Sequence, residues 1–203
     1  MGRGPLEAHV EHAADFCRAV RWASSRLPSG SAQPSAGLRV VDLGSGSGLP
    51  GLALALDDAS LVLALIESQE RRCAFLEAAI ERLGLGERVS VVHARAEQAG
   101  RSPEHRGRYQ VAVARSFGPP AVTAECAAPL LAMGGRLVVS EPPAGEASSD
   151  IDRRWPTAGL AMVGMGVAVP FERAHRFVVI TQEREVSDRF PRRVGVPTKR
   201  PLF

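Results

Sequence analysis

Cysteine, lysine and long apolar runs are all scarce in this chain of 203 residues. The three cysteines, Cys17, Cys73 and Cys126, lie far apart and form neither a CxxC pair nor a Cys/His cluster with zinc-site spacing. We therefore expect reduced thiols in the core and no metal site. No stretch approaches about 18 uninterrupted apolar residues, and the N-terminus lacks the apolar core of a signal peptide. We expect a cytoplasmic protein that does not enter a membrane.

Positive charge is carried almost entirely by arginine, because Lys199 is the only lysine among 25 basic residues. The formal net charge at pH 7 is +3, which is modest evidence for an anionic partner. The hydrophobic content of 45% and the charged content of 23% are ordinary for a globular protein. A chain of this length can bury a substantial core in one main domain.

The most informative stretch runs from residue 38 to residue 56. A β-branched run reaches Asp42, three glycines follow at alternate positions, and Pro50 begins a segment rich in leucine and alanine. This order predicts a buried strand, a tight turn and a helix with proline in its first turn. Such a turn leaves backbone N–H groups and a helix N-terminus open to a ligand. The three glycines are Gly44, Gly46 and Gly48.

Two nucleotide-type ligands suit this turn. Gly46, Gly48 and Gly51 satisfy the dinucleotide fingerprint, and the acid Glu67 follows about 20 residues later. That fingerprint needs its first glycine directly after the strand, whereas here Asp42 and an earlier Gly-Ser-Gly intervene. An acid-x-Gly-x-Gly-x-Gly turn instead resembles motif I of class I S-adenosylmethionine (SAM) methyltransferases. The resemblance implies that Asp42 and the glycine turn bind SAM and that Glu67 holds its ribose hydroxyls.

The chain divides into three parts by composition. Apolar residues at three- to four-residue spacing predict one amphipathic helix over residues 6–27, followed by a linker over 28–37. Residues 1–37 are therefore expected to form an N-terminal helical extension. A SAM-binding domain over 38–183 and a basic, proline-containing tail over 184–203 complete the chain.

Strand-like and helix-like segments alternate after the glycine turn. The predicted strands cover 61–66, 89–92, 111–114, 137–140, 160–169 and 177–181; the predicted helices cover 69–83 and 121–133. We expect Ser68 to cap the first of these helices and Gly84 to stop it. The prediction is an α/β fold with a Rossmann-like, doubly wound sheet of seven strands. Resemblance to the class I methyltransferases implies that the last strand pair is antiparallel.

Four motifs resemble the RsmG (GidB) family in order and spacing. They are Val41–Gly51, with its Leu-Pro-Gly after the glycines, then 67–76, 93–97 and 114–117. The basic ending over 190–201 is similar to the tail of many members. That family methylates N7 of a guanine in 16S ribosomal RNA with SAM. The resemblance implies SAM as cofactor and ribosomal RNA or the small ribosomal subunit as partner, and we expect a monomer.

The same resemblance implies roles for individual residues. Gly44 and Leu49 would line the cofactor, Ala96-Glu97 would lie at its adenine, and Arg115 would reach cofactor or substrate. Arg95 matches an arginine that faces RNA, with a surface ion pair as the alternative. The tail would be an extended arm that contacts RNA phosphates, unless it is solvated or folds over the domain. Its candidate RNA contacts are Arg192, Arg193, Lys199 and Arg200.

The chain also departs from the family pattern. Members often carry Lys-Gly after the fifth strand, where this chain has Ser140-Glu141-Pro142-Pro143; an acid there would weaken RNA binding. The usual helical segment with Trp, Arg and His is not recognisable before residue 38, which indicates a shortened N-terminus. His9 and His12 lie beside the apolar stripe of the predicted first helix, so we expect them at the surface. The loop over 142–156 is a candidate lid.

These departures leave the acceptor open. The alternatives are a methyltransferase of the same fold acting on a small molecule or a protein, and a SAM- or RNA-binding module without transfer activity. For guanine N7, no catalytic base is expected, because N7 already carries an in-plane lone pair. Rate then comes mainly from holding N7 in line with the methyl group.

Overall fold

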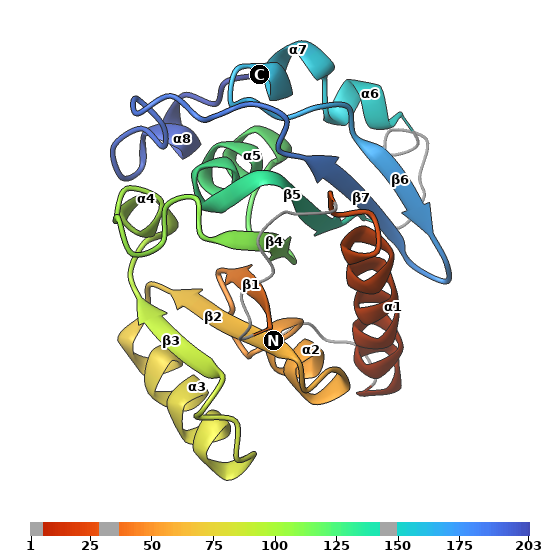
Figure 1. The fold of residues 1–203 in the computed structure, drawn as a ribbon, viewed down its shortest axis with the longest axis vertical. Coiled ribbons are helices and arrows are strands. Elements are labelled where there is room, and N and C mark those ends of the chain that lie inside the picture. The colour runs from red at the N-terminus through yellow and green to blue at the C-terminus, as the bar shows by residue number, and fades with distance from the viewer. Residues whose placement is uncertain (1–5, 29–36, 143–149) are drawn as a thin grey trace.

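The computed structural model describes residues 6–28, 37–142 and 150–203. Its centre is a sheet of seven strands in the order β3-β2-β1-β4-β5-β7-β6 (Figure 1). The first five strands run parallel, and β7 pairs antiparallel with both β5 and β6. The strands are β1 (Leu38–Leu43), β2 (Leu61–Glu67), β3 (Val89–His93), β4 (Tyr109–Ala114), β5 (Leu131–Ser140), β6 (Val169–Glu172) and β7 (Arg176–Thr181).

Helices cover both faces of this sheet, as the alternating pattern predicts. The helices are α1 (Leu6–Ser24), α2 (Gly51–Asp57), α3 (Glu70–Arg82), α4 (Ala96–Ala99), α5 (Pro120–Ala127), α6 (Ile151–Arg154), α7 (Thr157–Ala161) and α8 (Val196–Lys199). The doubly wound α/β prediction, with its antiparallel last pair, is confirmed.

Successive residues of the central strands point to opposite faces of the sheet. Val40 belongs to an apolar cluster with residues of α1, α2 and α3, whereas Val41 belongs to a second cluster with residues of α4, α5 and α7. Val111 and Ala112 of β4 divide in the same way, because side chains alternate across a strand. The central strands are therefore buried on both faces, which explains their near-continuous apolar sequences.

The C-terminal end of α3 is determined by the local sequence at Gly84. Gly84 has a φ of +66°, its N–H donates to Glu81 O at 3.1 Å, and Leu85 N donates to Ile80 O at 3.0 Å. This is the Schellman arrangement, so glycine does stop the helix. The start of the helix differs from the prediction, because Gln69 occupies the N-cap position instead of Ser68.

Two element predictions are wrong. The helix predicted over 121–133 ends at Ala127, and a 3-10 turn (Ala128–Leu130) leads directly into β5. Pro129 has no N–H and its ring clashes with an α-helical backbone, so the helix cannot continue there. The strand predicted over 160–169 is instead α7 and a turn, and β6 begins only at Val169. Leu160 in α7 and Val163 in the turn are both fully buried.

The N-terminal helix packs on the domain as a cover for one face. α1 contacts α2, β4, β5 and β7, and it ends at Ser24 instead of residue 27. Most of the predicted linker, and residues 143–149 of the predicted lid, lie outside the described residues. Among the described helices, none combines the length and the apolar character that crossing a membrane requires.

Candidate functional site

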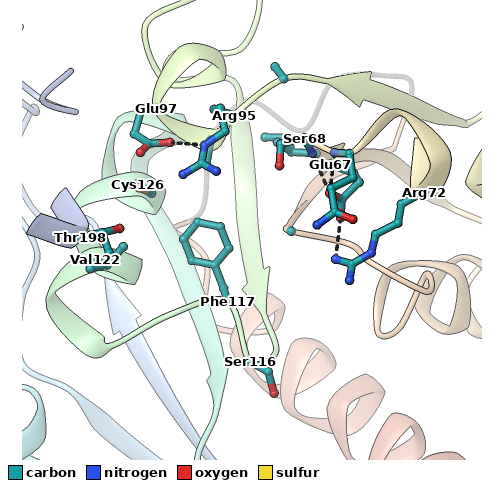
Figure 2. Close-up of a pocket in the computed structure, with 15 residues that line it drawn as sticks. Glu67, Ser68, Arg72, Arg95, Glu97, Ser116, Phe117, Val122, Cys126 and Thr198 are labelled. Carbon is teal, nitrogen blue, oxygen red and sulfur yellow. Dashed lines mark hydrogen bonds and ion pairs between the residues drawn. The ribbon is translucent and has the colours of Figure 1, made fainter. Parts of the chain in front are cut away.

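A cavity opens at the carboxyl ends of the parallel strands, where ligands bind in sheets of this type (Figure 2). Its volume is about 230 Å³. Much of the lining comes from the carboxyl ends of four neighbouring strands: Gly44 after β1, Glu67 at the end of β2, 94–97 after β3, and 116–117 after β4. The topology thus brings together motifs that are separated by more than 70 positions in the sequence.

The glycine turn has the backbone geometry that its sequence predicts. Gly44, Gly46 and Gly48 have φ values of +65°, +56° and +89°, in the region that favours glycine. A Cβ atom on Gly44 would lie 2.8 Å from Cδ2 of Phe117. Only a residue without a side chain therefore lets the Phe117 ring pack beside the turn at the cavity wall.

Asp42 is buried beneath the glycine turn and binds the backbone at the start of α2. It is 1% exposed, and its Oδ2 accepts a hydrogen bond from Gly51 N at 3.0 Å. Burial raises the pKa of this carboxyl to about 7. Asp42 does not line the cavity, and neither do the predicted cofactor residues Gly46, Gly48 and Leu49.

Glu67 is held rigidly at the cavity. Its side chain is buried, and Oε1 accepts hydrogen bonds from Ser68 N at 2.8 Å and Gln69 N at 2.9 Å. Its Oε2 accepts from Gly46 N at 3.0 Å and lies 3.8 Å from Nη1 of Arg72. These three backbone donors fix the orientation of the carboxylate at the cavity. An oriented carboxylate of this kind can accept hydrogen bonds from the two hydroxyls of a ribose.

A second carboxylate stands on the other side of the cavity. Glu97 is 4% exposed, and its Oε2 lies 3.6 Å from Nε of the half-exposed Arg95. Its Oε1 accepts a hydrogen bond from Gly195 N at 3.0 Å. Cys126 lies on the same side, and burial raises the pKa of its thiol, which therefore stays protonated.

A second, larger cavity of about 670 Å³ adjoins the first. Ser116 and Phe117 line both, so the segment after β4 is their shared wall. Ser116 has a φ of +54°, a conformation uncommon for a residue other than glycine. Arg115 lines only the second cavity, and its Nη2 donates to His9 Nδ1 at 3.1 Å.

The expectation that His9 and His12 are plain surface residues is wrong. Helix α1 brings His12 into the second cavity, half-buried, with its ring near that of His175. Burial and the charge of Arg115 lower the pKa of His12 to about 4, so its imidazole is neutral at pH 7. The buried Nδ1 of His12 has no hydrogen-bond partner among the described residues. A ligand in this cavity could provide one.

An acid–histidine pair that the sequence analysis missed supports this wall. Asp15 is 3% exposed; it accepts a hydrogen bond from His175 N at 3.1 Å and lies 3.0 Å from His175 Nδ1. Although burial opposes ionisation, hydrogen bonds from His175 and Arg18 hold the pKa of Asp15 below its usual value. The available signal was an acid within the apolar stripe of the predicted helix, between Ala13 and Phe16.

Glu141, the acid predicted near the substrate mouth, does line the second cavity, but other residues of the protein compensate its charge. Glu141 is 8% exposed, and its Oε1 accepts a hydrogen bond from Nε1 of Trp155 at 3.0 Å. Its Oε2 lies 2.6 Å from Nε of Arg154. The carboxylate is therefore neutralised within the protein. Trp155 is 1% exposed and packs in the core.

The expectation that the basic tail is extended is also wrong. Arg192 forms an ion pair with the fully buried Glu125, and α8 follows directly. Thr198 of α8 lines the first cavity. Arg193, Lys199 and Arg200 remain exposed.

Comparison with known proteins gives a consistent result. The model of the rRNA small subunit methyltransferase G family matches residues 28–145. Ribosomal RNA small subunit methyltransferase G of Rubrobacter xylanophilus is 40% identical over 174 residues, which are 81% of this chain and 65% of that protein. The protein of the same name from Symbiobacterium thermophilum is 36% identical over 208 residues, covering 98% of this chain and 80% of its own.

Solved structures share the fold at low sequence identity. A putative sarcosine dimethylglycine methyltransferase from Galdieria sulphuraria superposes with a TM-score of 0.62 at 10% identity, covering 87% of both chains. A SAM-dependent O-methyltransferase from Thermotoga maritima gives a TM-score of 0.58 at 14% identity, covering 84% of this chain and 66% of its own.

Proposed function

The chain belongs to the rRNA small subunit methyltransferase G family, a family of SAM-dependent enzymes, and we propose that it methylates N7 of a guanine in 16S ribosomal RNA. One observation carries this proposal at the level of the site. Two cavities meet at a shared wall, Ser116 and Phe117, one suited to a nucleoside cofactor and the other larger and bordered by Arg115.

The residues of the first cavity fit SAM. Glu67 presents a buried, oriented carboxylate to a ribose, and Gly44 lets the Phe117 ring pack against the turn at the cavity wall. Ala96 and Glu97 would hold the adenine end. Bound SAM supplies an electrophilic methyl group on a sulfonium; the protein's part is to bind and orient it beside Phe117.

The second cavity suits a guanine that needs no deprotonation. Its N7 lone pair is already the nucleophile, so the wall has only to place that atom in line with the methyl group. Methylation leaves the base positively charged. A neutral His12 avoids repelling that charge, which an imidazolium at the same place would do. Arg115 is placed to contact an RNA phosphate or the base itself.

The test is methyl transfer in vitro from SAM with a labelled methyl group to 16S ribosomal RNA and to assembled small subunits. We expect the label in N7-methylguanine after digestion of the RNA. Glu67→Gln should raise the KM for SAM by about tenfold, because the ribose loses its ionised acceptor. The matched control is Glu87→Gln. Glu87 is an exposed acid before the amino end of β3, away from the cavity, so this substitution should leave the KM unchanged.

Other results would identify the alternatives. Label in a small molecule or a protein, with none in RNA, would mean a different acceptor. SAM binding without transfer to any acceptor would indicate a binding module. If Glu67→Gln and Glu87→Gln had the same KM for SAM, the assignment of Glu67 would be wrong.

A further inference from the structure

We propose that the basic segment over residues 190–199, here called the strap, completes the cofactor site, and that Arg192 positions that site instead of contacting RNA. The inference rests on the proposed function, because it takes the first cavity as the place of SAM. Figure 1 shows α8, within the strap, lying against α5 and near α4, the two helices beside that cavity.

The first anchor of the strap is a buried fork of charged hydrogen bonds. Arg192 donates from Nε to Glu125 Oε1 at 2.8 Å and from Nη2 to Glu125 Oε2 at 2.6 Å. Its backbone N also donates to Glu125 Oε1, at 2.9 Å. Glu125 is 0% exposed and is the only charged residue of α5, so it depends on this arginine for compensation of its charge. Next to it, Cys126 lines the cavity.

The second anchor acts directly on a cavity carboxylate. Gly195 N donates to Glu97 Oε1 at 3.0 Å, and Gly195 has a φ of +79°, which favours glycine. The other oxygen, Oε2, faces Arg95. The strap therefore sets the orientation of Glu97. Figure 2 shows Thr198 beside Val122 on the same wall of the cavity.

The third anchor fixes where the strap begins. Arg106 donates to Phe190 O at 2.8 Å and to Val186 O at 2.9 Å, and the Phe190 side chain is 2% exposed. The same guanidinium donates to Gly100 O at 3.0 Å, at the end of α4. The strap is thus tied to the ends of α4 and to α5 at separate points. These contacts position α4 and α5 at the side of the cavity where the adenine would bind.

Two neighbouring arginines of the strap differ in burial, so substitutions at the two positions form a matched pair. Arg192 faces inward to Glu125, whereas Arg193 is exposed. We compare Arg192→Gln with Arg193→Gln, measuring the Kd for SAM by calorimetry without RNA, the Kd for a 16S ribosomal RNA fragment at two salt concentrations, and the Tm. Arg192→Gln should weaken SAM binding by about tenfold and leave RNA binding within about twofold. Arg193→Gln should leave SAM binding unchanged.

Loss of Arg192 leaves a buried carboxylate unpaired, so two further variants keep the test decisive. Arg192→Gln combined with Glu125→Gln removes both charges, and we expect it to regain stability but not the SAM affinity of the wild type. Thr198→Trp alters the exposed side chain at the cavity wall, and it should weaken SAM binding by about tenfold with an unchanged Tm.

The proposal is overturned if folded Arg192→Gln binds SAM as the wild type does and loses RNA affinity instead. It is also overturned if Thr198→Trp binds SAM normally. Failure of the proposed function would look different, because the wild-type protein itself would then not bind SAM, or would bind it without methylating RNA.

Discussion

Two glycines with nearly the same φ separate the effect of left-handed backbone from the effect of a close approach. Gly44 has a φ of +65° and Gly84 a φ of +66°. A Cβ atom on Gly44 would lie 2.8 Å from the Phe117 ring, whereas nothing lies within 4 Å of one on Gly84. Alanine at either position must therefore adopt a positive φ, but only Gly44→Ala intrudes on the cavity wall.

The expected magnitudes follow from this geometry. Left-handed backbone costs an L-residue about 1–2 kcal/mol, so each variant should lower the free energy of unfolding by that amount. For a chain of this size, the Tm should fall by roughly 2–8 °C. Gly44→Ala must also displace Phe117, and we expect its Kd for SAM to rise by about tenfold, or about 1.4 kcal/mol. Gly84→Ala should bind SAM as the wild type does.

The assays are thermal unfolding and calorimetric titration with SAM on the two purified variants. Equal Kd values for Gly44→Ala and Gly84→Ala would show that the turn does not approach the cofactor, and would refute the reasoning. Weak SAM binding by Gly84→Ala would show that strain alone accounts for the loss.

Three further predictions concern buried titratable groups. Burial raises the pKa of Asp42 to about 7 in the folded state, so the folded state keeps a proton that the unfolded state loses near pH 4. The free energy of unfolding should therefore fall as the pH rises from 4 to 7. Asp42→Asn should remove this pH dependence in urea unfolding. The pKa of His12 is lowered to about 4 in the folded state, so on acidification the unfolded state takes up a proton at a higher pH than the folded state does. The free energy of unfolding should therefore fall as the pH drops from 6.5 to 4, by up to about 1 kcal/mol per pH unit. This fall should be smaller in His12→Gln. Glu141→Gln should lower stability by about 2 kcal/mol, because Arg154 loses its partner; wild-type stability in urea would contradict that pairing.

Local patterns predicted the parts of the fold that local forces decide. The strand, glycine turn and helix around Asp42 follow from β-branched residues, φ-permissive glycines and a proline near the helix start. Gly84 likewise ended α3 through backbone hydrogen bonds within six residues. The helix predicted over 121–133 is shorter than expected because Pro129 cannot continue an α-helix, which is also a local effect.

The site was only partly predictable, because its remaining features depend on distant partners. Sequence motifs pointed to Gly44 and Glu67, which do line the first cavity. The environment of Glu141 could not be foreseen, since Trp155 reaches it only once the chain has folded. The same holds for Arg192, whose partner Glu125 precedes it by 67 residues on another element. A basic composition alone does not tell an inward-facing arginine from an exposed one.

The central claim is tested most directly by mapping N7-methylguanine in 16S ribosomal RNA from cells with and without this gene, using reduction and strand cleavage at the modified base. We expect one modified guanine to disappear in the deletion and to return with the wild-type gene, but not with a Gly46→Arg version, because an arginine there would disrupt the glycine turn. An identical map in both strains would contradict the proposed acceptor.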